Sequence, residues 1–410
     1  MSKDLLRTAF YQKIPQFWPD LYNEPYALYD MHMLDDERLY ALREATKACG
    51  QLFFKTASLL RQLDDDTLLQ MGYPVEALSF LRIEPYMSES IIARFDFVFY
   101  EGKMKVLELN SDTPTFIKEL FFVNQHVCEA FRVKDINEGE EERLQRAVTA
   151  VINKAKQHIK TDTPHIVFTS HGDHVEDRYT AKYLQSLYDE ESCFVPLDRL
   201  QIIEGDGLYD DKGKKIDILY RQTFPIECAL LDEAQSGDPI GEWLLQLVCD
   251  RKLHIINPPS AFLLQNKAVQ AIIWGLHEQN HPFFSAEEHQ WIAQYFLPTY
   301  LDADYFQEKH ISYVKKPVFG REGDTIEVYN EKGMKVIEEE KRTYTAYKGI
   351  YQKYVDLPTT SMNVDGQIKS LHYMYGSFFI DGEASAIGCR AGGQITNNLS
   401  YYVPLGREET

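Results

Sequence analysis

Hydrophobic and polar positions recur with two different periods along the chain, and each change of period marks a predicted change of structure. Apolar residues at helical spacing over 36–81 predict helices, one of which starts at Asp64 with an acidic first turn. Alternating apolar and polar residues over 91–100 and 104–110 predict two strands. The residues between them, 101–103, predict the turn of a hairpin.

The pattern after this hairpin is helical over 115–131 and 140–160, and it then becomes an alternation of strands and helices. Short strand-forming stretches lie at 166–170, 193–200, 216–224 and 254–259, with a helix over 241–252. Such an alternation predicts a small α/β domain with a largely parallel sheet. Helices are then predicted to about residue 300, followed by antiparallel strands with polar turns. We therefore expect a mixed α/β and α+β protein.

The net charge and the spacing of the cysteines exclude several classes of function and indicate the compartment. The 410 residues include 43 Lys and Arg against 63 Asp and Glu, a net charge of −20. A chain this acidic lacks the basic field that nucleic acids and anionic membranes require, so neither is an expected partner. The six cysteines show no zinc-site spacing, which predicts a reducing compartment and no structural metal. With no signal-peptide pattern and no membrane-spanning apolar run, we expect a cytoplasmic protein.

Four polar residues lie on the predicted hairpin: Arg94, Asp96, Glu108 and Asn110. A turn at 101–103 pairs residue 100 with 104, which places Asp96 opposite Glu108 and Arg94 opposite Asn110, unless a bulge shifts the register. All four side chains then share one face of the hairpin. Two carboxylates and an amide oxygen are ligands that Mg²⁺ takes when it also binds phosphates. The alternative is a solvated face, although both faces are more apolar than an exposed hairpin needs.

A second candidate site is a loop with two glycines. Lys316 ends a predicted strand and precedes Gly320 and Gly323, and a new strand is predicted over 325–329. Glycines allow a positive φ and a close approach of the backbone to a phosphate. The loop has no GxxxxGK[ST] pattern, so a plain hairpin turn is the alternative. Lys267 is either a second lysine at the phosphates or a solvated residue at a helix start.

Two further segments have two interpretations each. The hydroxyl and acidic residues at 111–115 either cap a helix or help that helix start to bind an anionic substrate. Glu176 and Asp177 either bind a cationic amine or cap a helix. His171 and His174 lie nearby, but two histidines without a third ligand are more typical of a surface than of a metal site.

Five stretches of the sequence, in this order, carry a family resemblance: ARFDFVFYEGKMKVLELNSDTPT, QNKA, VKKPVFGREG, GIYQKYV and GCRAGGQITNNLSYYVP. Together they resemble the synthetase domain of the glutathionylspermidine synthase family, a branch of the ATP-grasp ligases. The resemblance runs from about Tyr86 to the C-terminus. It implies a circularly permuted ATP-grasp fold with an inserted α/β pre-ATP-grasp-like domain. The metal-ligand hairpin and N-terminal helices fall in 1–161, the inserted substrate-side domain in 162–258, and the nucleotide-binding region in 259–410.

The same resemblance implies a reaction and its cofactors. In this family ATP converts a carboxylate into an acyl phosphate, and an amine then attacks to form an amide. ATP and two Mg²⁺ ions are the implied cofactors, and a small-molecule acid and amine of the peptide or polyamine class are the implied partners. The residues that match the family's metal ligands are Asp96, Glu108 and Asn110. Arg94 matches the arginine that stabilises the transferring phosphoryl group.

The resemblance also implies which residues bind the nucleotide and which bind the substrates. The residues that match positions at ATP are Lys267, Lys316, Gly320, Gly323, Gln352, Lys353 and Arg390. Those that match positions at the glutathione-like substrate are Thr113 and Thr115, with Arg321 beside them. The residue after Arg390 is Ala391, where the family usually has glutamate, which leaves open a non-catalytic nucleotide-binding or regulatory protein that retains the fold. A purely structural α/β protein is a third possibility, but it leaves five ordered motifs unexplained.

Overall fold

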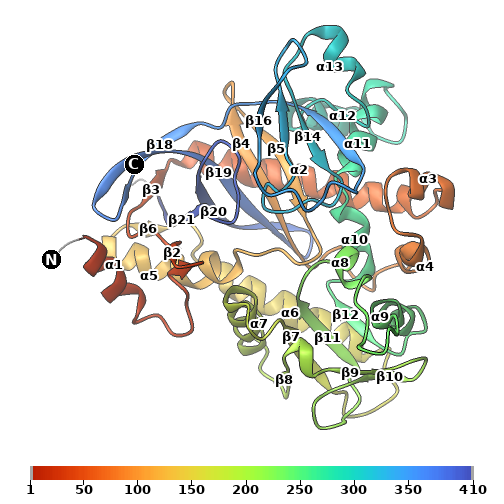
Figure 1. Cartoon of the computed structure of the whole chain (residues 1–410). Helices are drawn as coiled ribbons and strands as arrows, with labels where there is room; N and C mark the ends of the chain where they lie inside the picture. Colours follow the sequence, from red (N-terminus) through yellow and green to blue (C-terminus); the bar gives the residue numbers. More distant parts are fainter. Residues whose placement is uncertain (1–2, 408–410) are drawn as a thin grey trace.

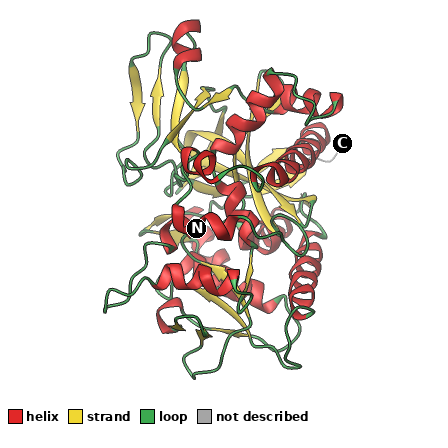
Figure 2. Cartoon of the chain, turned by 90° about the vertical axis from the view of Figure 1, so that its right-hand side faces the viewer, coloured by secondary structure: helices red, strands yellow, loops and turns green. Residues whose placement is uncertain are grey.

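The computed structural model describes residues 3–407. Figure 1 shows an upper part that contains two mainly antiparallel sheets and a lower part that contains a parallel sheet, and the turned view in Figure 2 shows the same division. The α-helices of these residues are α1 (Lys3–Tyr11), α2 (Asp36–Leu60), α3 (Asp65–Gln70), α4 (Leu78–Leu81), α5 (Asn124–Phe131), α6 (Glu140–Lys156), α7 (Val175–Ser186), α8 (Ile226–Ala229), α9 (Ile240–Cys249), α10 (Pro259–Gln265), α11 (Ala268–Glu278), α12 (Ala286–Tyr295) and α13 (Asp304–Lys309). None of the helices within residues 3–407 is long and apolar enough to span a membrane.

The central sheet of the upper part places the predicted hairpin between other strands and a helix. Its strands run in the order β21-β20-β19-β4-β5, with β18 paired to β19. Their bounds are β4 (Ile92–Tyr100), β5 (Lys103–Asn110), β18 (Thr359–Val364), β19 (Gln367–Ile380), β20 (Glu383–Gly392) and β21 (Tyr401–Val403). Helix α2 covers one face, where Phe53 packs edge-on against Phe95 with ring centroids 5.6 Å apart. Because neighbouring residues point to opposite faces, Asp96 lies on the face away from α2.

The hairpin has the predicted pairing at its polar end but a different turn. Tyr100 pairs with Lys103, so the turn consists of Glu101 and Gly102 alone, and both have positive φ (49° and 74°). The predicted turn at 101–103 is therefore wrong, because two residues of this conformation suffice to match the twist of the strands. Leu107 is an extra residue in β5, and this bulge restores the predicted pairs farther along the hairpin.

A five-stranded antiparallel sheet carries the candidate nucleotide residues. It runs in the order β13-β17-β14-β15-β16. Its bounds are β13 (Thr299–Tyr300), β14 (Tyr313–Pro317), β15 (Glu327–Tyr329), β16 (Lys335–Glu338) and β17 (Gly349–Lys353). β15 starts later than the predicted strand at 325–329, because Thr325 has a positive φ of 61°. Lys316 on β14 pairs with Ile350 on β17. Gln352 lies two residues beyond Ile350 on β17, so its side chain is on the same face of the sheet as that of Ile350.

The lower part contains a four-stranded parallel sheet in the order β12-β11-β7-β8. Its strands are β7 (Ile166–Ser170), β8 (Cys193–Phe194), β11 (Ile218–Gln222) and β12 (His254–Ile256). The parallel pairing agrees with the prediction from the alternation of strands and helices. The remaining strands form small sheets: β1 (Asp20–Leu21) with β2 (Glu24–Pro25), β9 (Gln201–Ile203) with β10 (Gly207–Tyr209), and β22 (Leu405–Arg407) between β3 (His32–Leu34) and β6 (Lys134–Asp135).

The helices follow the sequence pattern with one interruption. The stretch 36–81 forms α2, α3 and α4 with a short 3₁₀ helix, η1 (Val75–Ala77), and Asp64 caps α3 by accepting a hydrogen bond from the Thr67 N–H. The helix predicted over 115–131 contains a π-helical segment, η2 (Glu119–Val123), before α5. Another 3₁₀ helix, η3 (Leu197–Arg199), follows β8. The boundaries near residues 162 and 258 stay a prediction.

Candidate active site

The polar end of the β4–β5 hairpin forms a buried, hydrogen-bonded group. Arg94 donates to both carboxylate oxygens of Asp96, from Nε at 2.8 Å and from Nη2 at 3.0 Å. The Nδ2 of Asn110 lies 3.3 Å from Asp96 Oδ2 and 3.5 Å from Glu108 Oε1. Arg94 pairs with Asn110, and Asp96 with Glu108, which are the two pairs that the sequence predicts. The four side chains therefore converge on one face of the hairpin.

This face is not the solvated surface that was the alternative interpretation. Arg94 is 4% exposed and Asp96 is 1% exposed. Charged groups are buried in this way when they pair with one another or serve a ligand, because removing them from water is costly. The guanidinium of Arg94 also donates through Nη1 to the Thr115 carbonyl oxygen at 2.8 Å, which fixes it on both sides.

Two lysines, one at the start of α11 and one on β14, contact this hairpin. Lys267, at the start of α11, is 5% exposed, and its Nζ lies 3.2 Å from Glu108 Oε2. Lys316 of β14 is 7% exposed and donates to the Leu107 carbonyl oxygen at 3.2 Å. The interpretation of Lys267 as a solvated residue is therefore wrong. Lys316, Lys267 and the hairpin lie together although they are far apart in the sequence.

Burial and neighbouring charges set the protonation of this group. Burial opposes the ionisation of Glu108, but Lys267 and Lys316 outweigh it and lower the pKa of Glu108 to about 2. Burial lowers the pKa of Lys316 to about 8, although Glu108 acts in the opposite direction. The carboxylate is thus charged at neutral pH, and the proton of Lys316 is held less firmly than that of an exposed lysine.

The glycine loop lies against the same lysine. Lys267 Nζ donates to the Gly320 carbonyl oxygen at 2.5 Å. Gly323 has a φ of +71°, and a Cβ added there would lie 2.7 Å from the Thr396 carbonyl oxygen. Only glycine fits this position without a shift of the backbone. The loop is therefore more than a connection between β14 and β15, because its backbone is fitted against two other segments.

Two cavities meet at Glu108. One, of about 100 Å³, is lined by Asp96, Glu108, Lys316, Gln352 and Lys353 among its polar residues. The aliphatic and methionine residues of its walls are Leu107, Val314, Ile326, Val328, Val355, Leu357, Met374 and Ile395. Lys316 Nζ donates to Gln352 Oε1 at 2.8 Å. A slot with apolar walls and with cationic and carboxylate groups in its lining has the chemistry that a nucleotide with its phosphates requires.

The second cavity, of about 60 Å³, is polar. It is lined by Arg94, Glu108, Asn110, Thr115, Glu176, Arg321 and Arg390, and it shares Glu108 and Gly323 with the apolar slot. Arg390 donates to the Asn397 carbonyl oxygen at 3.0 Å, and Arg321 donates to that of Thr113 at 3.0 Å. This cavity therefore joins the hairpin to three residues expected at the substrates, Thr115, Glu176 and Arg321. Arg390, which was expected at ATP, lines this cavity and not the apolar slot.

The structure does not bring every predicted substrate residue to this cavity. Thr113 is 3% exposed and lines neither cavity. Its hydroxyl is buried and has no hydrogen-bond partner. Asp177 pairs instead with His174 at the start of α7, with 2.9 Å between Oδ2 and Nδ1. The residue that caps α7 is His174, and not the predicted Glu176 or Asp177. The hydrogen bond with the Asp177 carboxylate raises the pKa of His174 to about 9, although burial opposes it. Burial and the neighbouring acids raise the pKa of Glu176 to about 8.

Sequence patterns missed the residues that hold the hairpin in place. Asn257, after β12, accepts from the N–H groups of Ile91 and Ile92 at 3.0 Å each and donates to the carbonyl oxygens of Ile92, Ser111 and Asp112. Asp112 also forms a buried ion pair with Arg221 of β11. These contacts tie the parallel sheet to the end of the hairpin. The only signal in the sequence was the polar run at 111–115.

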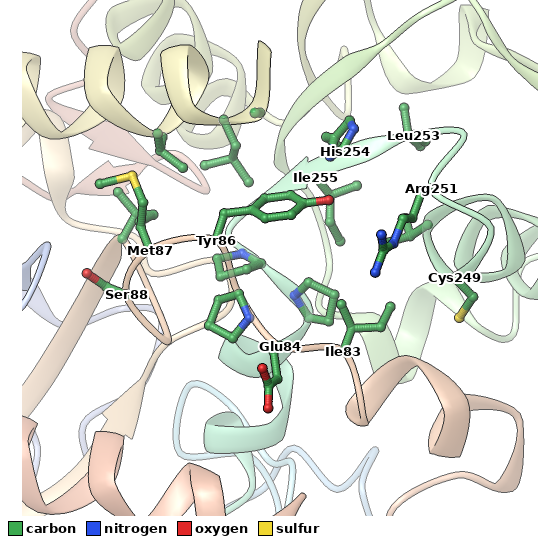
Figure 3. A pocket seen from close by; sticks show the side chains of 18 of the residues that line it. Ile83, Glu84, Tyr86, Met87, Ser88, Cys249, Arg251, Leu253, His254 and Ile255 are labelled. Carbon is green, nitrogen blue, oxygen red and sulfur yellow. The ribbon is translucent and has the colours of Figure 1, made fainter. Parts of the chain in front are cut away.

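A further cavity, of about 390 Å³, lies apart from this site (Figure 3). Tyr86 and His254 line it, and Tyr86 stacks on His158 with ring centroids 3.9 Å apart. None of its lining residues is one that the sequence predicted for the site. The candidate active site is therefore the pair of cavities at Glu108.

Comparisons with known proteins agree with this geometry. A family model described as "Glutathionylspermidine synthase preATP-grasp" matches residues 8–406. A Haemophilus influenzae protein named "Putative acid--amine ligase" is 26% identical over 334 residues, covering 78% of this chain and 74% of that protein. The apo structure of a glutathione synthetase-like effector from Globodera pallida matches with a TM-score of 0.60 at 13% identity, over 99% of this chain and 96% of the other. Together with the family model, this similarity confirms the predicted fold class, a mixed α/β protein of the ATP-grasp type.

Proposed function

Since the chain belongs to the glutathionylspermidine synthase preATP-grasp family, we propose that it is an acid–amine ligase that uses ATP and Mg²⁺ to form an amide. Membership in this family agrees with the resemblance seen in the sequence motifs. The similarity to a protein named as an acid–amine ligase supports the coarser assignment of a ligase. The acid and the amine are small molecules, and we place both at the polar cavity.

The observation that carries the proposal is the meeting of the two cavities at Glu108. The apolar slot suits a nucleotide and the polar cavity suits polar substrates. Both cavities are lined by Glu108 and Gly323. Phosphoryl transfer depends on positioning and on neutralising charge rather than on a protein nucleophile. Lys267, Lys316 and Arg94 supply that neutralisation from three different elements.

The proposed reaction has two steps. An oxygen of the acid attacks the γ-phosphorus of ATP, ADP leaves, and an acyl phosphate remains. The amine nitrogen then attacks the acyl carbon, phosphate leaves, the amide forms, and the nitrogen releases a proton. Arg94 is placed to stabilise negative charge in both steps, because it lines the polar cavity and is held rigidly by Asp96 and Thr115.

The hairpin fits Mg²⁺ by the chemistry of its donors. Asp96 and Glu108 offer carboxylate oxygens, and the Asn110 amide lies between them, with Nδ2 toward both. A rotation of this amide by half a turn would direct its oxygen to the same point, which gives three oxygen donors of the kind Mg²⁺ takes. Bound there, Mg²⁺ would neutralise charge on the phosphates of ATP. Asp96, Glu108 and Asn110 are therefore the proposed metal ligands.

Ala391 does not disturb this arrangement. It is 1% exposed and belongs to the hydrophobic core that α2 lines, whereas the preceding Arg390 lines the polar cavity. Neighbouring residues of β20 point to opposite faces, so the side chain at position 391 is directed away from the cavity. The absence of a glutamate here is thus a weak argument for a non-catalytic protein.

The proposal is tested with the full chain, ATP, Mg²⁺ and a panel of peptide acids and amines. ADP release that requires both an acid and an amine, with a product mass equal to their sum less water, is the expected result. The Arg94→Met variant should bind ATP but form no product. ATP binding without ADP release for any pair would favour the non-catalytic alternative, and failure to bind ATP with Mg²⁺ would overturn both.

A further inference from the structure

The parallel sheet of the lower part has an unassigned crevice at the ends of its strands. After β7 the chain continues to β8 on one side of it, whereas β11 and β12 lie on the other side. The order therefore reverses between β7 and β11. In open α/β sheets, ligands bind beyond the carboxyl ends of the strands at such a reversal. His171 follows β7 and Thr223 follows β11, and both line one cavity there.

This cavity has a volume of about 140 Å³ and walls that are mainly aliphatic. Leu219 of β11, Leu208 of β10 and Leu244 of α9 contribute to them. An engineered cavity of about 150 Å³ lined by aliphatic and aromatic groups stays dry and binds benzene. The space therefore suits an apolar group of about the size of a leucine or phenylalanine side chain.

Two buried polar atoms of residues that line the cavity have no hydrogen-bond partner. Thr169 is 0% exposed and Arg221 is 3% exposed, and the hydroxyl of Thr169 and the Nε of Arg221 are both unpartnered. The two residues pair across β7 and β11, so their side chains lie on the same face of the sheet. Leaving buried donors unpaired destabilises a protein, and such groups in a cavity indicate a missing acceptor.

The charge of Arg221 is already balanced. Its Nη2 forms the ion pair with Asp112, and its Nη1 lies 3.4 Å from both the Thr223 hydroxyl and the Phe224 carbonyl oxygen. The Nε–H that remains calls for a neutral acceptor, such as an amide carbonyl, rather than a second carboxylate. An apolar group next to an amide carbonyl is the chemistry of a peptide residue with an aliphatic or aromatic side chain.

One residue of the cavity lining, Arg221, is bonded to the segment that follows the β4–β5 hairpin. Asp112, which pairs with Arg221, lies two residues after Asn110 and accepts from the Ile226 N–H at 3.2 Å. Thr113, the next residue, accepts through its carbonyl oxygen from Gln222 at 3.5 Å. The cavity is thus connected through one short segment to the polar cavity at Arg94.

We propose that this cavity binds the apolar side chain of the acid substrate, a peptide, whose neighbouring amide carbonyl accepts hydrogen bonds from Thr169 and Arg221. The inference rests on the proposed ligase function for its substrate, but the cavity itself is tested without ATP or amine. The probe is N-acetyl-L-leucinamide, and N-acetylglycinamide is the probe without the side chain. Binding to the full chain is measured by ligand-observed NMR and calorimetry.

We expect the leucine probe to bind more than tenfold more tightly than the glycine probe. Leu244→Trp fills the cavity and should abolish binding. Thr169→Val removes one donor at nearly constant volume and should weaken binding about threefold to tenfold. Thr180→Val is the matched control, since Thr180 is 1% exposed and has an unpartnered hydroxyl but does not line the cavity. Equal binding of the two probes, or binding unaffected by Leu244→Trp, would overturn the proposal.

Kinetics then test the assignment to the acid. With peptides that support ADP release, Leu244→Trp should raise KM at least tenfold for those with an apolar residue and leave KM for glycine-only peptides unchanged. If the leucine probe binds but this variant changes no KM, the cavity is a separate site and the substrate assignment is wrong. If no peptide supports ADP release while wild type binds the probe and Leu244→Trp does not, the ligase function fails and the cavity remains.

Discussion

Lys267 and Glu108 form an ion pair that joins the start of α11 to β5, with Nζ 3.2 Å from Oε2. The same Nζ donates to the Gly320 carbonyl oxygen at 2.5 Å, so one ammonium group connects the hairpin with the glycine loop. Against the effect of burial, Lys267 contributes most to the low pKa of Glu108, about 2. At neutral pH the removal of Lys267 would therefore leave the half-buried carboxylate of Glu108 with less charge compensation.

Replacing Lys267 with methionine should lower both stability and nucleotide affinity. The loss of one partner from a fully buried ion pair costs about 3 kcal/mol or more, and because the Glu108 side chain is 24% exposed, the expected cost here is about 2 kcal/mol. We expect the free energy of unfolding in urea to fall by about this amount and ATP affinity to fall by more than tenfold.

The double variant Lys267→Met with Glu108→Gln separates these two effects. Neutralising Glu108 removes the uncompensated charge, so most of the lost stability should return while ATP affinity stays low. A double variant as unstable as the single one would show that Lys267 acts through packing and not through the ion pair.

The common face of the polar residues on the β4–β5 hairpin could be predicted because these residues alternate on both strands, whereas their pairing follows from the expected turn. The turn itself could not be predicted: the conformations of Glu101 and Gly102 shorten it by one residue, and the bulge at Leu107 compensates for this. The two deviations cancel, so the predicted pairing of Asp96 with Glu108 is confirmed. Neither deviation is visible in a pattern of period two, since a bulge changes the pairing without changing the composition.

The ties between the two parts of the molecule lay beyond sequence reasoning for a different reason. Asp112 and Arg221 are paired only after the parallel sheet has docked, and Asn257 satisfies five backbone groups of residues 91–92 and 111–112, where the chain enters and leaves the hairpin. Each is a single polar residue without a periodic signal. Local patterns predict the elements, whereas such contacts depend on how distant elements meet.

Asp96→Asn should weaken the Mg²⁺ dependence of ATP binding. The substitution keeps the shape of the side chain but removes one of two carboxylates from the proposed metal site, so the Mg²⁺ concentration needed for half-maximal ATP binding should rise at least tenfold. Calorimetric titrations of Mg²⁺ in the presence of ATP measure this. Glu101→Gln, an exposed residue in the turn of the same hairpin, is the control and should leave the titration unchanged. An Asp96→Asn titration equal to that of wild type would refute the metal assignment.

ATP binding should weaken at alkaline pH through Lys316. Burial lowers the pKa of Lys316 to about 8, with Glu108 opposing, and only the protonated ammonium attracts phosphate. The Kd for ATP should therefore be nearly constant from about pH 6 to 7.5 and rise above pH 8, approaching about tenfold per pH unit. Lys316→Arg keeps its charge over this range, so its profile should be flat. A wild-type profile that stays flat to about pH 9.5 would contradict the role of Lys316.

Gly323→Ala and Gly333→Ala test whether the glycine loop is fitted to the nucleotide site. Both glycines have a positive φ, +71° and +70°, but a Cβ at Gly323 would lie 2.7 Å from the Thr396 carbonyl oxygen, whereas a Cβ at Gly333 would meet nothing within 4 Å. Each substitution costs about 1 kcal/mol in backbone conformation alone. Gly333→Ala should show this loss in urea unfolding and no change in ATP affinity.

Gly323→Ala should lower both the stability and the ATP affinity more than Gly333→Ala does. The added Cβ forces Thr396 to move, and Thr396 lines both cavities together with Gly323. We expect a loss of about 2 kcal/mol or more in stability and at least tenfold in ATP affinity. The difference between the two variants isolates the steric contact from the cost of the conformation. If they lose the same stability and both retain ATP affinity, the loop is a connection without a part in binding, and the site must be built without it.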